Sequence, residues 1–302
     1  MWKPEPTFCL LPQGDITALD TDVAILGASH GSPYRPGTPS HAAGGPSGLR
    51  GALEWYDTRR EHVDMDRGAP LMAGVTAVDI GDVPTDPDDD GAANRKAIRE
   101  AVAAVRAAGA APILLGGDDS VPIPFYEGFK GEEIWIVQVD AHIDWRDEVD
   151  RVAHGFSSTM RRASEMAQVK GIVQLGLRGV GSAREGEVAT AIEWGAQIFP
   201  MRLVHAEGLA PVLAAVPEGA KVALNIDADG LDPALCPGAL SPEFGGLGYQ
   251  QMLDLFDGLA AKCRIVGATV VEYVPERDPA GLGGKSLGRL ICNLISAIGP
   301  RP

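Results

Sequence analysis

The chain has 302 residues, 45% of them hydrophobic, and a formal net charge of −15 from 26 basic and 41 acidic side chains. This composition is that of an ordinary globular protein and excludes disorder or a coiled coil as a description of the whole chain. With this acidity and no cluster of Lys and Arg, we expect no nucleic-acid partner. We also expect no membrane association, because no apolar run approaches the ~18–20 residues that a span requires.

The chain start and the cysteines indicate a cytoplasmic protein. No apolar segment follows Lys3, so the first residues do not resemble a signal peptide. Cys9, Cys236, Cys263 and Cys292 are scattered and form no CxxC pair, which is typical of reduced thiols. We therefore expect neither disulfides nor a zinc site built from cysteine.

Short apolar segments alternate with helical patterns along the chain. Residues 22–28 (DVAILGA), for example, form a continuous apolar run that ends in small residues, as a buried parallel strand does. The pattern predicts strands at 22–28, 75–80, 111–115, 133–139, 171–176, 197–201, 221–226 and 264–271. It predicts helices at 48–56, 91–109, 159–166, 185–194, 249–261 and 287–298.

This alternation predicts the fold class. Helices between parallel strands cover both faces of the sheet. No change of composition marks a second domain. We therefore expect residues 1–302 to form a single three-layer α/β domain, with helices on both sides of a parallel sheet of about eight strands.

Acidic residues follow four of the predicted strands directly. Ligands of an open parallel sheet bind beyond the carboxyl ends of its strands, so residues at these positions are candidates for a site. The sequence there reads GGDDS after 111–115, DAHID after 133–139, DAD after 221–226 and a single Glu after 264–271. The candidate residues are Asp119, Asp140, His142, Asp144, Asp227, Asp229 and Glu272.

The spacing of these acids favours bound metal. Alternate residues of an extended chain point to the same side, so Asp140, His142 and Asp144 can converge on one spot, as can Asp227 and Asp229. Several ionised carboxylates within a few ångströms repel one another strongly at neutral pH. Divalent cations remove that repulsion, and a pair of ions ~3.5–4 Å apart is a common hydrolytic centre.

At this point the chain resembles the ureohydrolase family of arginases, agmatinases, guanidinobutyrases and formiminoglutamases, and within it the agmatinase-like branch. The resemblance covers nearly the whole chain, and its motifs occur in family order. Besides the acidic runs, the motifs are RPG (35–37), GP (45–46), DIGD (79–82), SPEFGGL (241–247) and VEYVP (271–275).

The resemblance implies a binuclear-metal hydrolase that cleaves a C–N bond of a small cationic guanidino compound to give urea and an amine. Its cofactors would be two divalent ions, Mn²⁺ with Ni²⁺ as the alternative, bridged by the attacking water. By similarity, Asp140 and Asp227 bridge the ions and Asp144 completes one site. His142 and Asp229 complete the other.

The resemblance also implies roles around the metals. Glu272 matches the acid that pairs with the substrate guanidinium, and a carboxylate can accept two hydrogen bonds from such a planar cation. Asp144 is expected to contribute to catalysis as well as to metal binding. Trp145 is a candidate by its position directly after Asp144: it either forms a wall of the substrate pocket, stacks on a cation, or packs in the core. Family members form trimers and hexamers, which implies a homo-oligomer.

Asp119 departs from the family pattern. The family has GGDHS, with the His ligating the first metal, where this chain has GGDDS. Asp can ligate a divalent ion through harder oxygen atoms. Five Asp charges then face two divalent ions, so we expect an alkaline activity optimum and weaker or altered metal binding at the first site.

Many members of the family have a His in a His-Gly turn after the DAHxD motif, and this His is implied to carry protons to the leaving amine. The position of this shuttle His is the second departure. His154-Gly155 follows His142 at a spacing that agmatinases use, which would make His154 a catalytic and substrate-binding residue. The segment that follows fits the family better if Phe156 takes the position of that His. The sequence leaves these two alignments open.

These departures motivate a different class of function. A catalytically impaired subunit, structural or regulatory in a hetero-oligomer, would tolerate Asp119 and a missing shuttle His. The retained ligand residues and Glu272 favour the enzyme. A metal-dependent deacetylase is disfavoured because the acidic runs and Glu272 follow the ureohydrolase order.

Overall fold

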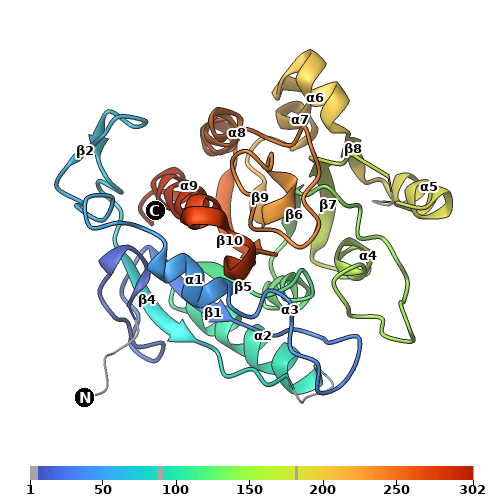
Figure 1. Ribbon diagram of the computed structural model, residues 1–302, viewed down its shortest axis with the longest axis horizontal. Coiled ribbons are helices and arrows are strands. Elements are labelled where there is room, and N and C mark those ends of the chain that lie inside the picture. The colour runs from blue at the N-terminus through green and yellow to red at the C-terminus, as the bar shows by residue number, and fades with distance from the viewer. Residues whose placement is uncertain (1–5, 88–90, 181–182, 302) are drawn as a thin grey trace.

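The computed structural model describes residues 6–87, 91–180 and 183–301, and its centre is an eight-stranded sheet (Figure 1). All neighbouring strands pair in parallel, as the alternation predicted. In spatial order the strands are β4 (Ala77–Asp82), β1 (Val23–Ala28), β5 (Ala111–Gly116), β10 (Arg264–Val271), β9 (Lys221–Asp227), β6 (Ile134–Val139), β7 (Val169–Leu175) and β8 (Gln197–Phe199).

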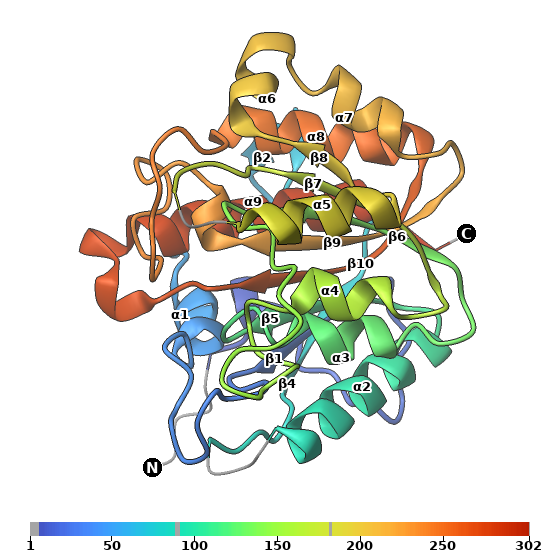
Figure 2. The same ribbon diagram turned by 90° about the vertical axis from the view of Figure 1, so that its right-hand side faces the viewer.

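Helices cover both faces of the sheet, which confirms the three-layer prediction (Figure 2). α2 (Ala92–Ala107), α3 (Pro122–Glu127), α4 (Thr159–Ser164) and α5 (Glu185–Trp194) belong to one face. The other face carries α1 (Gly45–Gly51), α6 (Met201–Glu207), α7 (Ala210–Ala215), α8 (Tyr249–Lys262) and α9 (Leu282–Ile298). Among the described residues, no helix is long and apolar enough to cross a membrane.

The strands are apolar on both sides because each side packs on a helical layer. In β6, Ile134 and Ile136 belong to the hydrophobic cluster with α2, α3 and α4, whereas Val137 and Val139 belong to the cluster with α8 and α9. This alternation is why the strands read as continuous apolar runs in the sequence.

Several element boundaries differ from the prediction. The helix expected at 48–56 ends at Gly51. Residues 52–76 instead form a long loop that contains a short hairpin of β2 (Val63–Asp64) and β3 (Ala69–Pro70). α9 begins five residues before the predicted start at 287. Two of the early residues, Gly283 and Gly284, approach the Cys236 and Tyr273 side chains too closely for a Cβ atom. α3, α6 and α7 were not predicted.

A buried ion pair joins α1 to the edge strand β4. Arg50 donates from Nε and Nη2 to the two carboxylate oxygens of Asp79 at 2.7 and 3.0 Å. The side chains are 4% and 1% exposed. Arg50→Leu would leave the Asp79 charge buried and unpaired, so we expect it to lower the free energy of unfolding by roughly 3–5 kcal/mol.

Denaturant unfolding followed by circular dichroism measures this loss. The matched control is Arg59→Leu, because Arg59 pairs with Glu61 on the surface, where both side chains are more than half exposed. An exposed pair contributes about 0–1 kcal/mol, so the control should be nearly as stable as the wild type. Equal losses in the two variants would contradict the prediction.

Candidate metal centre and substrate cavity

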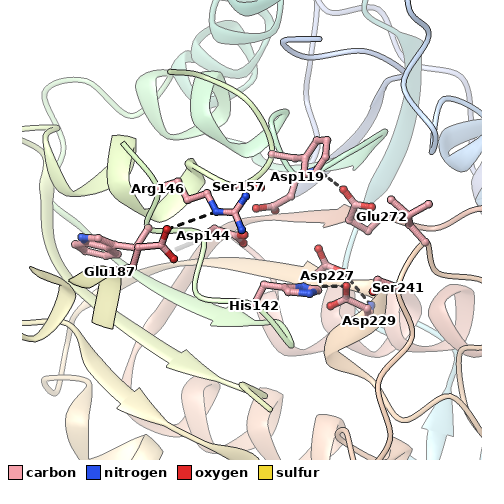
Figure 3. Close-up of a pocket in the computed structure, with 13 residues that line it drawn as sticks. Asp119, His142, Asp144, Arg146, Ser157, Glu187, Asp227, Asp229, Ser241 and Glu272 are labelled. Atoms are coloured by element: carbon pink, nitrogen blue, oxygen red, sulfur yellow. Dashed lines mark hydrogen bonds and ion pairs between the residues drawn. The ribbon is translucent and has the colours of Figure 1, made fainter. Parts of the chain in front are cut away.

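Four adjacent strands at the centre of the sheet bring the predicted acids to one edge (Figure 3). Asp227 is the last residue of β9, and Asp140 and Glu272 directly follow β6 and β10. Asp119 lies three residues beyond β5. Because these strands are parallel, their carboxyl ends open at the same edge. A cavity of about 260 Å³ lies there, lined by Asp119, His142, Asp144, Asp227, Asp229 and Glu272 among others.

The first cluster of acids is Asp119, Asp140 and Asp144, whose carboxylate oxygens lie within 4.8 Å of one another. All three side chains are buried. Asp119 Oδ1 accepts a hydrogen bond from Asn225 at 2.8 Å, whereas its Oδ2 is buried without a hydrogen-bond partner. A buried carboxylate oxygen without a partner is costly unless a cation binds it.

The second cluster is Asp140, His142 and Asp229, whose potential ligand atoms also lie within 4.8 Å of one another. His142 Nδ1 is 3.1 Å from Asp229 Oδ2. Asp227 lies beside this cluster, where its Oδ1 accepts a hydrogen bond from the Asp229 backbone N–H at 2.8 Å. Asp140 belongs to both clusters, so one carboxylate connects them.

The protonation equilibria show how strongly the acids repel one another. Burial, and then the charges of neighbouring acids, raise the pKa values of Asp119, Asp140 and Asp227 well above the usual Asp range. Burial alone would lower the pKa of His142, but its hydrogen bond to Asp229 raises it to about 9. The cluster therefore takes up positive charge, as protons when no metal is bound, and divalent cations fit the same need.

A buried polar row supports the acids from inside the sheet. Gln174, Gln138, Asn225 and Thr269 are register neighbours across β7, β6, β9 and β10, and all four are fully buried. Gln138 Nε2 donates to Asp140 at 2.7 Å and to Asp144 at 3.1 Å.

The rest of the row holds these donors in place. Gln174 Nε2 donates to the side-chain oxygen Oε1 of Gln138 at 2.6 Å. The Thr269 hydroxyl donates to the side-chain oxygen Oδ1 of Asn225 at 2.6 Å. Each contact fixes which way a side-chain amide faces, and therefore which acid it supports. Sequence reasoning missed this row, although Gln138 and Asn225 stand out as polar residues within apolar strands, each two positions before an Asp.

Glu272 is held by two partners at the cavity wall. Its backbone is in the left-handed region, with φ 62°. Its Oε1 accepts the Asp119 backbone N–H at 2.9 Å, and its Oε2 pairs with His41 Nε2. Burial would lower the pKa of His41, but the hydrogen bond and charge of Glu272 raise it. Nothing in the sequence pattern pointed to His41, which lies in the segment between β1 and α1.

The structure does not bring His154 to the cavity. Burial, and then the charges of Arg95 in α2 and Arg162 in α4, lower the pKa of His154. Phe156 lines the cavity instead, and its ring packs edge-on against His41 with the centroids 5.3 Å apart. The geometry thus favours the alignment in which Phe156 takes the position of the shuttle His.

Trp145 meets two of the alternatives drawn from the sequence. It lines the cavity, yet it is only 2% exposed and packs against Trp194 with ring centroids 6.0 Å apart. Sequence reasoning overlooked its neighbour Arg146, which also lines the cavity beside Ser157 and Glu187. The cavity is smaller than the ~300–1,000 Å³ of typical drug-sized pockets, which favours a small ligand.

Comparisons with known proteins agree with this geometry. The family model described as "Arginase family" matches residues 21–298. A guanidinobutyrase of Pseudomonas aeruginosa is 32% identical over 260 residues, covering 78% of this chain and 76% of that protein. A mitochondrial agmatinase of Gallus gallus is 30% identical over 292 residues, covering 90% and 81%.

The fold is also found among solved structures. A hypothetical agmatinase from Burkholderia thailandensis superposes with a TM-score of 0.80 at 24% identity, covering 96% of this chain and 89% of that one. This likeness concerns the fold alone.

Proposed function

The chain belongs to the arginase family of metal-dependent amidinohydrolases, and from that premise we propose that it hydrolyses a C–N bond of a small guanidino compound to urea and an amine at a binuclear metal centre. The observation that carries the proposal is the pair of acid clusters sharing Asp140, in one cavity with Glu272.

The residues present fit two divalent ions, with Mn²⁺ as the first candidate and Ni²⁺ as the second. The unpartnered Oδ2 atom of Asp119 and the raised pKa values of the acids both indicate missing positive charge. Oxygen and imidazole donors suit these metals. Asp119, Asp140, Asp144 and Asp227 would hold one ion, with Asp140 and Asp227 common to both ions. The residues for the other are Asp140, His142, Asp227 and Asp229.

Divalent ions held by these residues would lower the pKa of water and so make hydroxide available near neutral pH. The chain's own residues do the rest. Glu272 accepts hydrogen bonds from the substrate guanidinium and holds its central carbon beside the acid clusters. His41 and the Asp119 N–H fix the Glu272 carboxylate from behind. Gln138 keeps Asp140 and Asp144 in position.

The catalytically impaired subunit is not favoured. Asp119 motivates it, but Asp119 offers a carboxylate oxygen within 4.8 Å of ligand atoms of Asp140 and Asp144, where a metal ligand is required. Because His154 does not line the cavity, the site lacks one candidate proton carrier, but it retains the metal ligands and Glu272.

The direct test is a urea-release assay over small guanidino compounds, with the protein reconstituted with Mn²⁺ and separately with Ni²⁺. We expect urea from at least one compound and about two ions per chain by metal analysis. No urea with either metal, or one ion or none per chain, would count against the proposal.

The two histidines near the site should differ in their effects. We expect His41→Ala to raise KM by about tenfold, because it removes a charge-assisted hydrogen bond to Glu272. His154→Ala should stay within about twofold of wild-type kcat/KM, since His154 does not line the cavity. Steady-state kinetics of both variants measures the contrast, and a larger loss in His154→Ala would restore the other alignment.

Assembly and location complete the proposal. We propose a cytoplasmic homo-oligomer, a trimer or hexamer, which multi-angle light scattering tests directly.

A further inference from the structure

We propose that Arg146 binds an anionic group at the far end of the substrate, so that the substrate is an ω-guanidino carboxylic acid and not an ω-guanidino amine. This inference rests on the proposed function, because it assumes that the guanidino end lies at Glu272. Arg146 is the one Arg or Lys side chain among the described residues that line the cavity.

The position of Arg146 is fixed by its backbone and by Glu187. Its backbone N–H donates to the Ser157 carbonyl at 3.0 Å, and Ser157 also lines the cavity. Its Nε lies 3.5 Å from Glu187 Oε1. Figure 3 shows the guanidinium extending from Glu187 toward Asp144. Glu187 thus pairs with the inner nitrogen of the guanidinium, and the two terminal nitrogens extend along the cavity wall toward Asp144.

The two terminal nitrogens of the Arg146 guanidinium are available as hydrogen-bond donors. Within the described part of the chain, neither terminal nitrogen of Arg146 makes a side-chain hydrogen bond or ion pair. A planar guanidinium presents two parallel N–H groups on one edge, which match the two oxygens of a carboxylate. The geometry therefore fits a carboxylate better than a single-point acceptor.

The charge balance favours the same ligand. Glu187 also pairs with Arg184, whose Nη1 donates to Glu187 Oε1 at 2.9 Å. One carboxylate therefore faces two guanidinium groups. In the proposed function Asp144, toward which Arg146 extends, is engaged by a metal ion, so one positive charge beside Glu187 remains unmatched. A substrate amine carries an ammonium that this charge would repel, whereas a substrate carboxylate would be attracted. The acid end of the cavity, at Glu272, takes the guanidinium.

The experiment compares ω-guanidino acids having two, three and four methylene groups with ω-guanidino amines of the same lengths, using the metal-reconstituted protein. We expect the wild type to prefer an acid over the amine of equal length. Arg146→Gln should raise KM for that acid by about 10- to 100-fold, with a smaller change in kcat, because uniform binding is lost. Arg146→Glu should shift the preference toward the amine.

The matched control is Arg161→Gln. Arg161 has a similar exposed fraction, 32% against 28%, but pairs with Asp147 and Glu165 and does not line the cavity. Its KM should match that of the wild type. Arg146→Lys keeps the charge without the paired donors, so it should restore part of the lost affinity. It also gives a reading if Arg146→Gln does not fold, as judged by circular dichroism.

The outcomes separate this inference from the proposed function. Urea from no compound with the wild type would count against the proposed function itself. Urea released from an amine as efficiently as from the matching acid would overturn only the role of Arg146. So would an unchanged KM for the acid in folded Arg146→Gln, or in Arg146→Glu.

Discussion

Asp227→Asn should nearly abolish urea release while making the metal-free protein more stable. Asp227 is 2% exposed and its pKa is raised by burial and by the charges of Asp229 and Asp140. Asn retains an oxygen that can accept the Asp229 N–H but removes the charge. Without metal, the variant should gain roughly 1–3 kcal/mol, the usual cost of an uncompensated buried polar group.

The loss of activity should be large because a metal ligand is lost. Metal ions contribute several kcal/mol to transition-state stabilisation, so we expect kcat to fall roughly 10³-fold or more. Metal analysis should find fewer ions per chain than in the wild type. Denaturant unfolding after chelation measures the gain in stability. A variant that keeps both ions and its activity, or that is less stable without metal, would contradict the prediction.

The gain should depend on pH. For an acid whose pKa is raised by folding, the stabilisation is complete below the unfolded-state pKa, ~3.9, and is lost as pH rises through the folded-state pKa. His142, raised to about 9, acts in the same direction. The metal-free wild type should therefore lose stability from about pH 4 upward. Asp227→Asn should flatten that dependence, and added Mn²⁺ should reverse the loss in the wild type.

Asp119→Ala should have the second largest effect, and it should act through the first metal. The substitution removes a buried carboxylate that offers an oxygen within 4.8 Å of ligand atoms of Asp140 and Asp144, and whose Oδ2 lacks a hydrogen-bond partner. We expect metal content to fall from two ions per chain toward one. kcat should fall by roughly 10²- to 10³-fold, because loss of one ion removes several kcal/mol of transition-state stabilisation.

Two companion variants sharpen the test. Asp119→His should retain two ions. Because it removes one negative charge from the site, it should also move the pH optimum of activity below the alkaline optimum that we expect for the wild type. Asp147→Ala is the surface control, since that side chain is 77% exposed, and it should behave like the wild type. Full metal content in Asp119→Ala would rule out Asp119 as a ligand.

The fold and the acid clusters could be predicted because their signals are local. Strands buried on both faces are continuous apolar runs, and a residue directly after such a strand lies at the carboxyl edge of the sheet whatever the loops do. All eight predicted strands are present. Asp119, His142, Asp144, Asp227, Asp229 and Glu272 accordingly line one cavity, with Asp140 beside them.

The sequence by itself therefore determined the α/β sheet and the acidic residues at the carboxyl edge of that sheet. From these acids it also led to the expectation of divalent metal. Only the tertiary structure decided that His41 reaches Glu272, that Phe156 and not His154 lines the cavity, and that Arg146 lines the same cavity as the acids. Those side chains belong to loops whose paths depend on packing against distant segments, so spacing along the chain does not fix where they point. The buried row of Gln138 and its neighbours needed strand order and register, which sequence alternation leaves open.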